Sequence, residues 1–365
     1  MSSEEYAAVA LSRVPAIGPK LFRSLVNHFG TASAVLSARP SELLEVDGIA
    51  EKTAAQFADK RYLREADRIG EYCSAHRVNI LHVGSDAYPA PLREFDTAPP
   101  VLYHEGRTDF LAPRMVAIVG TRRMSSLGAR QVERLIDPLA ARGVLIVSGL
   151  AYGVDIAAHR RALHVGLPTL AVLGSGLQHI YPREHAAVAR KFAERGGGLL
   201  TEYPPWQSPE REHFPARNRI VAMLADITVV VESDTSGGSM ITANMAHGYG
   251  RMVGACPGRG GDARTAGCNA LIRSGRAQLI DGADDLLKLL NWGPSTAGPQ
   301  LQLFDLTPDE QTLVKLLDNQ EVLAIDDFLR RLRVPPATLA ATLLTLEMKG
   351  AITALPGHRY RMSAG

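Results

Sequence analysis

The stretch MVAIVGTRRMSSLGARQVERLI, residues 115–136, begins with a short apolar run, continues through a glycine and a polar loop, and ends in an amphipathic helical pattern. An apolar run of this length beside Gly-containing turns is typical of a strand buried on both faces of a parallel sheet. The same alternation recurs along residues 83–292 and predicts a Rossmann-like, doubly wound α/β domain between two smaller domains. We expect six parallel strands, at 115–120, 144–149, 169–174, 198–203, 227–233 and 252–258.

Glycines, small hydroxyl side chains and arginines follow the carboxyl ends of these strands, where a doubly wound sheet binds its ligands. Glycine lets the backbone approach a ligand, a helix N-terminus offers N–H groups to an anion, and the arginine fork matches a phosphate. The sequence therefore predicts a phosphate-binding edge of the sheet. Its candidate residues are Gly120, Thr121, Arg122, Arg123, Ser148, Gly149, Arg183, Arg217, Asn218, Arg219, Gly237, Gly238 and Ser239.

The motifs of several enzyme classes are missing from this edge. In GTRRMSSLG (120–128) the second glycine comes too late for the dinucleotide fingerprint, and the sequence has no Walker A Gly-Lys-Ser/Thr. Ser148 lies in VSGLA, which is not a nucleophile elbow. Asp155 and His159 lie one helical turn apart, but without a third metal ligand nearby we interpret them as a structural pair in which the carboxylate orients the imidazole. We expect a binding protein with no catalytic residues, cofactor or metal.

The overall charge is nearly balanced. The 365 residues include 40 Lys and Arg against 38 Asp and Glu, a net charge of +2, which excludes a polycation that binds acidic partners by bulk attraction. Of the basic residues, 33 are Arg and 7 are Lys, which reflects either a GC-rich genome or a use of Arg for phosphate recognition. Many arginines lie away from the strand ends, so we attribute most of the excess to genome composition and the binding to the few at the sheet edge.

Cysteine usage and hydropathy indicate a cytoplasmic protein. Cys73, Cys256 and Cys268 have spacings that fit no zinc or redox pair and are expected to be reduced thiols. The acidic N-terminal segment lacks the apolar core of a signal peptide. No apolar run reaches the roughly 18 residues that a membrane span needs.

Residues 1–82 contain two similar segments, VPAIGPK (14–20) and VDGIAEK (46–52), each followed by a helical stretch. The pattern is that of a tandem helix-hairpin-helix, or SAM-like, domain, in which backbone N–H groups at the turn can meet a DNA phosphate. The region carries 10 basic and 10 acidic residues, so we favour packing or protein contacts over strong DNA binding. Whether these hairpins touch duplex DNA stays open.

A Gly/Pro/Ser-rich linker, 293–303, leads to a C-terminal domain at 304–365. Three helical segments and two short strands around Gly357 predict a winged helix. Between Pro335 and Gly350, however, the charged residues are Glu347 and Lys349, and no Arg, Asn or Gln is present to read a base edge. We expect this domain to contact protein, or the rest of its own chain, rather than a specific duplex sequence.

Motifs in this order resemble the DNA-processing protein A family (DprA, also called Smf). The resemblance begins with Tyr88-Pro89, Leu92, PVLY (100–103) and Gly106, and it covers more than half the chain. It continues through IVGTRRMSSLG (118–128), IVSGLAYGVDIAAHRRAL (146–163), YPREH (181–185), FPARNRI (214–220), GGSMITA (237–243) and PGRGGDARTAGCNALIRSG (257–275).

The resemblance implies a non-enzymatic protein that binds single-stranded DNA during natural transformation. It also implies a homodimer that helps load the RecA recombinase onto strands covered by single-strand-binding protein. By motif, Arg122 and Arg183 correspond to the family's basic residues that hold the DNA backbone. At the position of Arg183 many members have Lys. Gly237 stands where many members have Ser, so a hydroxyl contact is missing there.

Aromatic residues flank the same loops. Tyr181, Tyr203, Trp206 and Phe214 are candidates for base stacking, although packing is the favoured interpretation for each one taken singly. A site that reads backbone and ring faces is expected to show little sequence preference.

Two rival functions are weaker. A nucleotide-processing enzyme of the lysine-decarboxylase-like phosphoribohydrolase type shares the Gly-rich strand ends, but its Pro-Gly-Gly-x-Gly-Thr loop is replaced here by PGRGGDARTAG (257–267). A transcription factor using the winged helix would protect specific duplex sites, which we do not expect.

Overall fold

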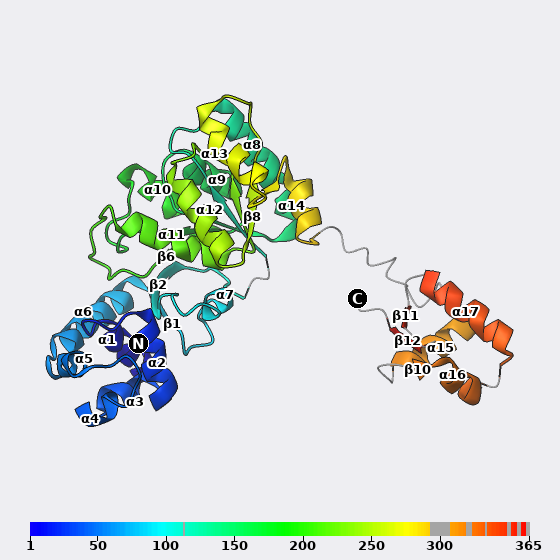
Figure 1. The fold of residues 1–365 in the computed structure, drawn as a ribbon, viewed down its shortest axis with the longest axis horizontal. Coiled ribbons are helices and arrows are strands. Elements are labelled where there is room, and N and C mark those ends of the chain that lie inside the picture. Colours follow the sequence, from blue (N-terminus) through cyan, green and yellow to red (C-terminus); the bar gives the residue numbers. More distant parts are fainter. Residues whose placement is uncertain are drawn as a thin grey trace. The chain divides into compact units, whose positions relative to one another are not determined.

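The structure, a computed structural model, describes residues 1–111, 114–292, 307–318, 323–332, 334–348, 352–355 and 359–362. The chain divides into two compact units, Met1–Asp285 and Leu286–Gly365 (Figure 1). The predicted linker at 293–303 lies outside the described residues. Among the described helices, none combines the length and apolar character needed to cross a membrane.

All six predicted strands are present in a nine-stranded sheet of order β1-β2-β6-β5-β4-β3-β7-β8-β9. The strands from β3 to β9 pair in parallel, so the predicted Rossmann-like core is confirmed. Two antiparallel strands, β1 and β2, extend the sheet beyond β6 and were not expected from the apolar pattern. The strands are β1 Asn79–His82, β2 Val101–Gly106, β3 Met115–Val119, β4 Leu145–Ser148, β5 Thr169–Val172, β6 Gly198–Thr201, β7 Ile227–Val230, β8 Met252–Ala255 and β9 Gln278–Leu279.

The order of the strands reverses direction between β3 and β7. From β3 the chain runs outward through β4, β5 and β6, and it then returns to the other side of β3. Helix α8 (Ser126–Ile136) packs against α9 (Val154–His164), and α11 (His213–Leu224) packs against α12 (Gly238–Gly248). Right-handed crossovers place these two pairs on opposite faces of the sheet. The remaining helices of this part are α7 Ala90–Arg93, η2 Asp137–Arg142, η3 Arg183–His185, α10 Ala186–Ala189, η4 Ala193–Arg195, α13 Ala263–Arg273 and α14 Ala283–Leu289.

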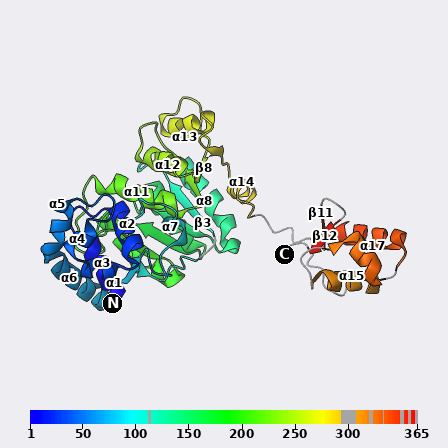
Figure 2. The same cartoon turned by 60° about the horizontal axis from the view of Figure 1, so that its bottom comes forward.

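The N-terminal helices pack against the sheet rather than forming a separate core (Figure 2). One apolar cluster includes Leu11 of the helical region together with Tyr103 of β2. Ile17 and Pro19, in the first hairpin, line a small cavity shared with Glu202, which follows β6. The first hairpin turn therefore faces the α/β part, which supports its interpretation as a packing element. The helices are α1 Ser3–Ser12, α2 Pro19–Phe29, α3 Ala32–Ser37, α4 Pro40–Leu43, α5 Glu51–Ala54, η1 Ala55–Ala58 and α6 Arg61–His76.

The C-terminal unit is a winged helix with its own core. Its apolar cluster includes Leu313, Phe328 and Leu343, one from each of its three helices. A three-stranded sheet of order β10-β12-β11 completes the fold. Gly357, in the predicted wing, lies outside the described residues. The elements are α15 Pro308–Asp318, β10 Leu323–Ala324, α16 Ile325–Leu332, α17 Pro336–Met348, β11 Ile352–Leu355 and β12 Arg359–Met362.

Asp155 and His159 are structural, but the expected pairing between them is wrong. The Asp155 carboxylate accepts the backbone N–H of Gly149 at 3.1 Å, whereas the His159 ring bonds the Thr169 hydroxyl at 2.7 Å. Each side chain thus ties α9 to a different strand end. Within the described ranges, no group of three or more His, Cys, Asp or Glu side chains is arranged to hold a metal ion.

The buried histidines predict a loss of stability in mild acid. Burial lowers the pKa of His159 to about 3 and that of His104 to about 4, from the usual 6.5. The unfolded chain therefore binds these protons below pH 6.5 while the folded chain does not, so each histidine should cost about 2 kcal/mol at pH 5 relative to pH 8. We expect His159→Gln to flatten the pH dependence of the free energy of unfolding, measured with urea at both pH values. An unchanged slope would contradict this assignment.

Candidate functional site

The predicted edge residues meet at a cavity of about 570 Å³ beyond the carboxyl ends of β3, β4 and β7. This is the point where the strand order reverses, the usual ligand site of a doubly wound sheet. The walls come from the loops after these strands and from α11 and α12. Nine of the predicted residues line the cavity: Gly120, Thr121, Arg122, Gly149, Arg217, Asn218, Gly237, Gly238 and Ser239.

The loop after β3 is fixed by Glu232, two residues after the end of β7. The Glu232 backbone carbonyl accepts the Thr121 N–H at 2.7 Å, and its carboxylate accepts the Ser125 N–H at 2.9 Å. The Ser125 hydroxyl in turn caps α8 by accepting the Gly128 N–H at 3.1 Å. The start of α8 is therefore already satisfied by the protein, and the exposed Arg122 is what this loop offers to a ligand.

A buried arginine fixes the loops after β4 and β5. Arg217 is 4% exposed, and its guanidinium donates to the carbonyl oxygens of Gly149, at 2.8 Å, and of Val172. The Asp155 carboxylate accepts two N–H groups of the same β4 loop, those of Gly149 at 3.1 Å and Ala151 at 3.3 Å. Burial lowers the pKa of Arg217 to about 10, so the side chain stays charged at neutral pH. Arg217 is thus a positioning residue within the cavity wall.

Helix α12 presents an open N-terminus to the cavity. Its N-cap residue, Gly237, supplies no side-chain cap. A side chain at Gly238 would meet nothing within 4 Å, so the first turn is accessible. The Ser239 hydroxyl donates to the Ser233 hydroxyl at 2.8 Å, which orders this turn. An uncapped N-terminus of an 11-residue helix favours an anion through its free N–H groups and its dipole.

Four predicted residues do not line the cavity. Ser148 is fully buried and its hydroxyl donates to the Ile118 carbonyl at 2.6 Å, inside the sheet. Arg219 forms an ion pair with Glu202 at 2.6 Å, with both side chains less than one-fifth exposed. Arg123, on the loop after β3, and Arg183, the first residue of η3, are both exposed.

Arg211 lines the cavity and was missed by sequence reasoning. It is exposed and belongs to the connection between β6 and α11, in the run SPERE (208–212). Two glutamates surround it, so local composition gave no sign of a binding arginine. Only the return of this connection across the strand ends brings Arg211 to the site.

The aromatic candidates separate into two groups. Tyr181, 44% exposed, and Phe214 line the cavity, with ring centroids 5.5 Å apart. Tyr203 instead packs on the His213 ring at 4.2 Å, and Trp206 packs under the Arg68 guanidinium of α6 at 4.3 Å. The first pair is placed for contact with a ligand, and the second holds neighbouring elements together.

Comparison with protein families gives three matches along the chain. The family described as DNA recombination-mediator protein A matches residues 79–291. The DprA winged helix domain matches residues 294–358, and the SAM-like helix-hairpin-helix tandem matches residues 9–57.

Individual relatives cover most of the chain. It is 32% identical to Protein Smf of Synechocystis sp., over 99% of each chain, and 36% identical to Protein Smf of Escherichia coli, over 78% of this chain and 77% of that one. Its structure matches that of DNA processing protein A from Streptococcus pneumoniae with a TM-score of 0.66 at 32% identity, covering 79% of this chain and 98% of the other. A Helicobacter pylori structure, titled for the single-stranded DNA binding mode of DNA processing protein A, matches with a TM-score of 0.54 at 32% identity, over 60% and 98% of the two chains.

Loss of the buried guanidinium should destabilise the protein. Arg217→Met leaves the Asp155 carboxylate buried without its cation and should lower the free energy of unfolding by about 3 kcal/mol. The exposed Arg123→Met is the matched control and should change it by less than about 0.5 kcal/mol. In denaturant titrations, we expect Asp155→Asn combined with Arg217→Met to recover part of the loss. Equal stability of the two single variants would contradict the positioning role.

Proposed function

This chain belongs to the family of DNA recombination-mediator protein A (DprA, or Smf), and from that premise we propose that it binds single-stranded DNA at the carboxyl edge of its sheet. The observation that carries the proposal is the pairing of the exposed Arg122 with the open N-terminus of α12 in one cavity. Both groups recognise phosphate without regard to base sequence.

The backbone contacts follow from the geometry of the cavity. Arg122 provides a bidentate guanidinium for one phosphate, and the free N–H groups at Gly238 and Ser239 donate to an oxyanion of another. Arg211 adds positive charge to the same wall. These local positive charges attract the DNA strand, although the net charge of the whole chain is only +2.

The bases would contact the aromatic pair Tyr181 and Phe214. The ring of Tyr181 is partly exposed beside Phe214 and offers a stacking face to an unpaired base. A duplex keeps its bases stacked inside, so it gains nothing from this face. The combination favours single strands and predicts little sequence preference.

Arg123, on the loop after β3, and Arg183, at the start of η3, extend the contact surface beyond the cavity as exposed cations. Gly120, Thr121, Gly149, Gly237 and Asn218 shape the wall. Arg217, Arg219 and Ser148 act indirectly, by holding the strand ends in place.

By family, we further propose a cytoplasmic homodimer that protects incoming single strands in transformation and recombination. In this role it helps load RecA in the presence of single-strand-binding protein. The activity is binding without turnover. Incubation of the purified chain with nucleoside monophosphates should therefore release no free base, and release would favour the phosphoribohydrolase alternative instead.

Removing Arg122, in the cavity, or Arg183, on η3, should weaken binding uniformly. We expect Arg122→Ala and Arg183→Ala to lower affinity by similar factors for oligonucleotides of unrelated sequence. Each should reduce the slope of log affinity against log salt by about 0.7 for every phosphate that the variant no longer neutralises. Fluorescence anisotropy at several salt concentrations measures both quantities, with Arg160→Ala, exposed on α9, as the control. Wild-type affinity and slope in Arg122→Ala would place the DNA elsewhere.

A carboxylate at the start of α12 should separate folding from binding. Gly238→Asp has open space for its side chain, and an acid at a helix N-terminus is favourable for the helix. We therefore expect an unchanged or slightly higher melting temperature together with weaker single-strand binding, because the carboxylate occupies the anion position. Gly238→Ser, which is neutral, should bind more tightly than Gly238→Asp. Equal binding by the two variants would exclude α12 from the interface.

A further inference from the structure

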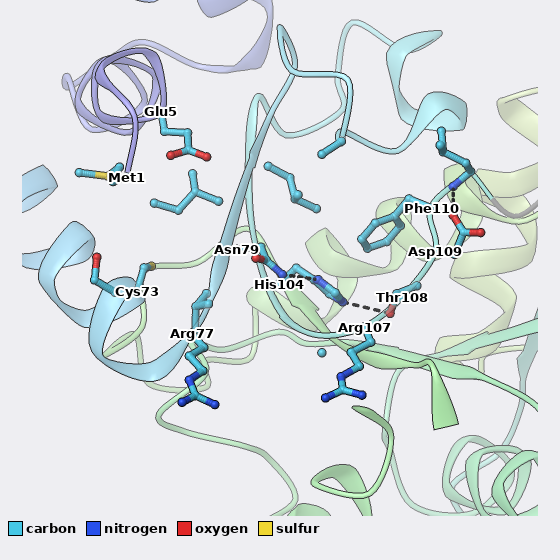
Figure 3. A pocket seen from close by; sticks show the side chains of 17 residues that line it. Met1, Glu5, Cys73, Arg77, Asn79, His104, Arg107, Thr108, Asp109 and Phe110 are labelled. Atoms are coloured by element: carbon cyan, nitrogen blue, oxygen red, sulfur yellow. Dashed lines mark hydrogen bonds between the residues drawn. The ribbon is translucent and has the colours of Figure 1, made fainter. Parts of the chain in front are cut away.

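A second cavity, of about 690 Å³, lies at the other edge of the sheet (Figure 3). It is bounded by Met1 and Glu5 at the start of the chain, by the end of α6, by β1 and β2, and by residues 107–111, which follow β2. Gly106 of β2 pairs with Gly198, the first residue of β6, so the cavity lies near the amino ends of the parallel strands. The DNA-binding cavity proposed above lies at their carboxyl ends. The two cavities are therefore distinct sites.

Two arginines from separate segments, Arg77 and Arg107, line this cavity and extend toward the same open side of it (Figure 3). Their backbones are held in place. Arg77 caps α6 in the left-handed region, with φ 55°, and its N–H donates to the Cys73 carbonyl. The Arg107 N–H donates to the Gly197 carbonyl at 2.9 Å. In the part of the chain that the structure describes, no hydrogen bond or ion pair engages either guanidinium. Both side chains are exposed, so the two guanidiniums are available to an anionic ligand, and we call this pair the cationic clamp.

Between the clamp and the interior lies an uncharged polar wall. His104 is 2% exposed, and its ring nitrogens lie 3.0 Å from the Thr108 hydroxyl and 3.5 Å from the Asn79 amide nitrogen. The amide can only donate, so Nδ1 accepts and Nε2–H donates to Thr108. Burial lowers the pKa of His104 to about 4, so the ring is neutral at pH 7. This wall offers fixed dipoles and carries no charge of its own. The cavity also has the Glu5 carboxylate of α1 in its lining, which accepts the Ser2 N–H at 2.6 Å (Figure 3).

An apolar surface completes the cavity. The Phe110 ring meets His104 edge-on at a centroid distance of 4.9 Å. Leu111, next to it, is 77% exposed and also lines the cavity. Asp109 lies on this side, with its carboxylate accepting the Leu111 N–H at 2.9 Å (Figure 3). Its negative charge directs an anionic group away from Phe110 and toward the arginines.

We propose that this cavity binds a nucleoside phosphate, with the phosphate between Arg77 and Arg107 and the base against Phe110 and Leu111. A cationic clamp, a polar wall and an apolar face are the three surfaces that such a ligand needs, and the volume is within the range of small-molecule sites. Neither inorganic phosphate nor a nucleoside alone uses all three. The proposal stands independently of DNA binding at the opposite edge.

The test is isothermal titration of the full chain with adenosine 5′-monophosphate, adenosine and inorganic phosphate. We expect saturable binding of the monophosphate and weaker binding of the other two. Combined Arg77→Ser and Arg107→Ser should weaken monophosphate binding by at least about tenfold through loss of charge-assisted hydrogen bonds. Leu111→Ser, an exposed position that should fold normally, should weaken binding of the monophosphate but not of phosphate. Arg160→Ser is the matched control and should bind as the wild type does.

Binding measurements on variants of each cavity distinguish the two sites. The Arg77/Arg107 variant should keep its affinity for single-stranded DNA, and Arg122→Ala should keep its affinity for the monophosphate. Three results would overturn the proposal: no saturable binding at millimolar monophosphate, monophosphate binding that is abolished in Arg122→Ala but kept in the Arg77/Arg107 variant, or loss of DNA binding in the Arg77/Arg107 variant. Equal binding of phosphate and monophosphate, unaffected by Leu111→Ser, would reduce the site to a simple anion site and contradict a nucleoside ligand.

Discussion

The carboxyl edge of the sheet depends on one buried guanidinium. Arg217 bonds the carbonyl oxygens that end β4 and β5, and Asp155 bonds the N–H groups of the same β4 loop. Burying a cation is costly unless a carboxylate and acceptors surround it, and here they do. Burial raises the pKa of Asp155, while Arg217 opposes that shift. The pair joins α9, α11 and two strand ends into one wall of the cavity.

The arginines of this chain divide into two kinds. Some neutralise acidic side chains, such as Arg219 with Glu202 and Arg161 with Asp137. Others, such as Arg122, remain exposed beside a cavity. Pairing removes a cation from the field felt by a distant polyanion, whereas an exposed cation contributes fully. The balanced total of 40 basic and 38 acidic residues therefore says little about which surface attracts DNA.

The two edges of the sheet are built differently. At the carboxyl edge, parallel strands all end on the same side and their loops converge, which concentrates glycines and helix N-termini. At the amino edge near β6, the antiparallel strand β2 reverses the chain, and the residues that follow it, 107–111, line a cavity together with the end of α6. The N-terminal helices thus do more than pack on the sheet, because the last of them closes a second cavity.

Fold class, the six parallel strands and the edge at which ligands are expected could all be predicted from the amino-acid sequence. Burial on both faces requires uninterrupted apolar runs, and the turns beyond them require glycine, so both features are visible in local sequence. The roles of individual arginines were decided by the tertiary structure alone. Arg122 and Arg217 carry the same side chain near the same edge, yet one is exposed and the other is buried against a glycine 68 residues away along the chain. Arg211 reaches the cavity only through the path of a long connection, and Arg77 and Arg107 line one cavity only because β1 and β2 are neighbours. Desolvation and partner distance depend on contacts between remote segments, and no local pattern in the sequence encodes them.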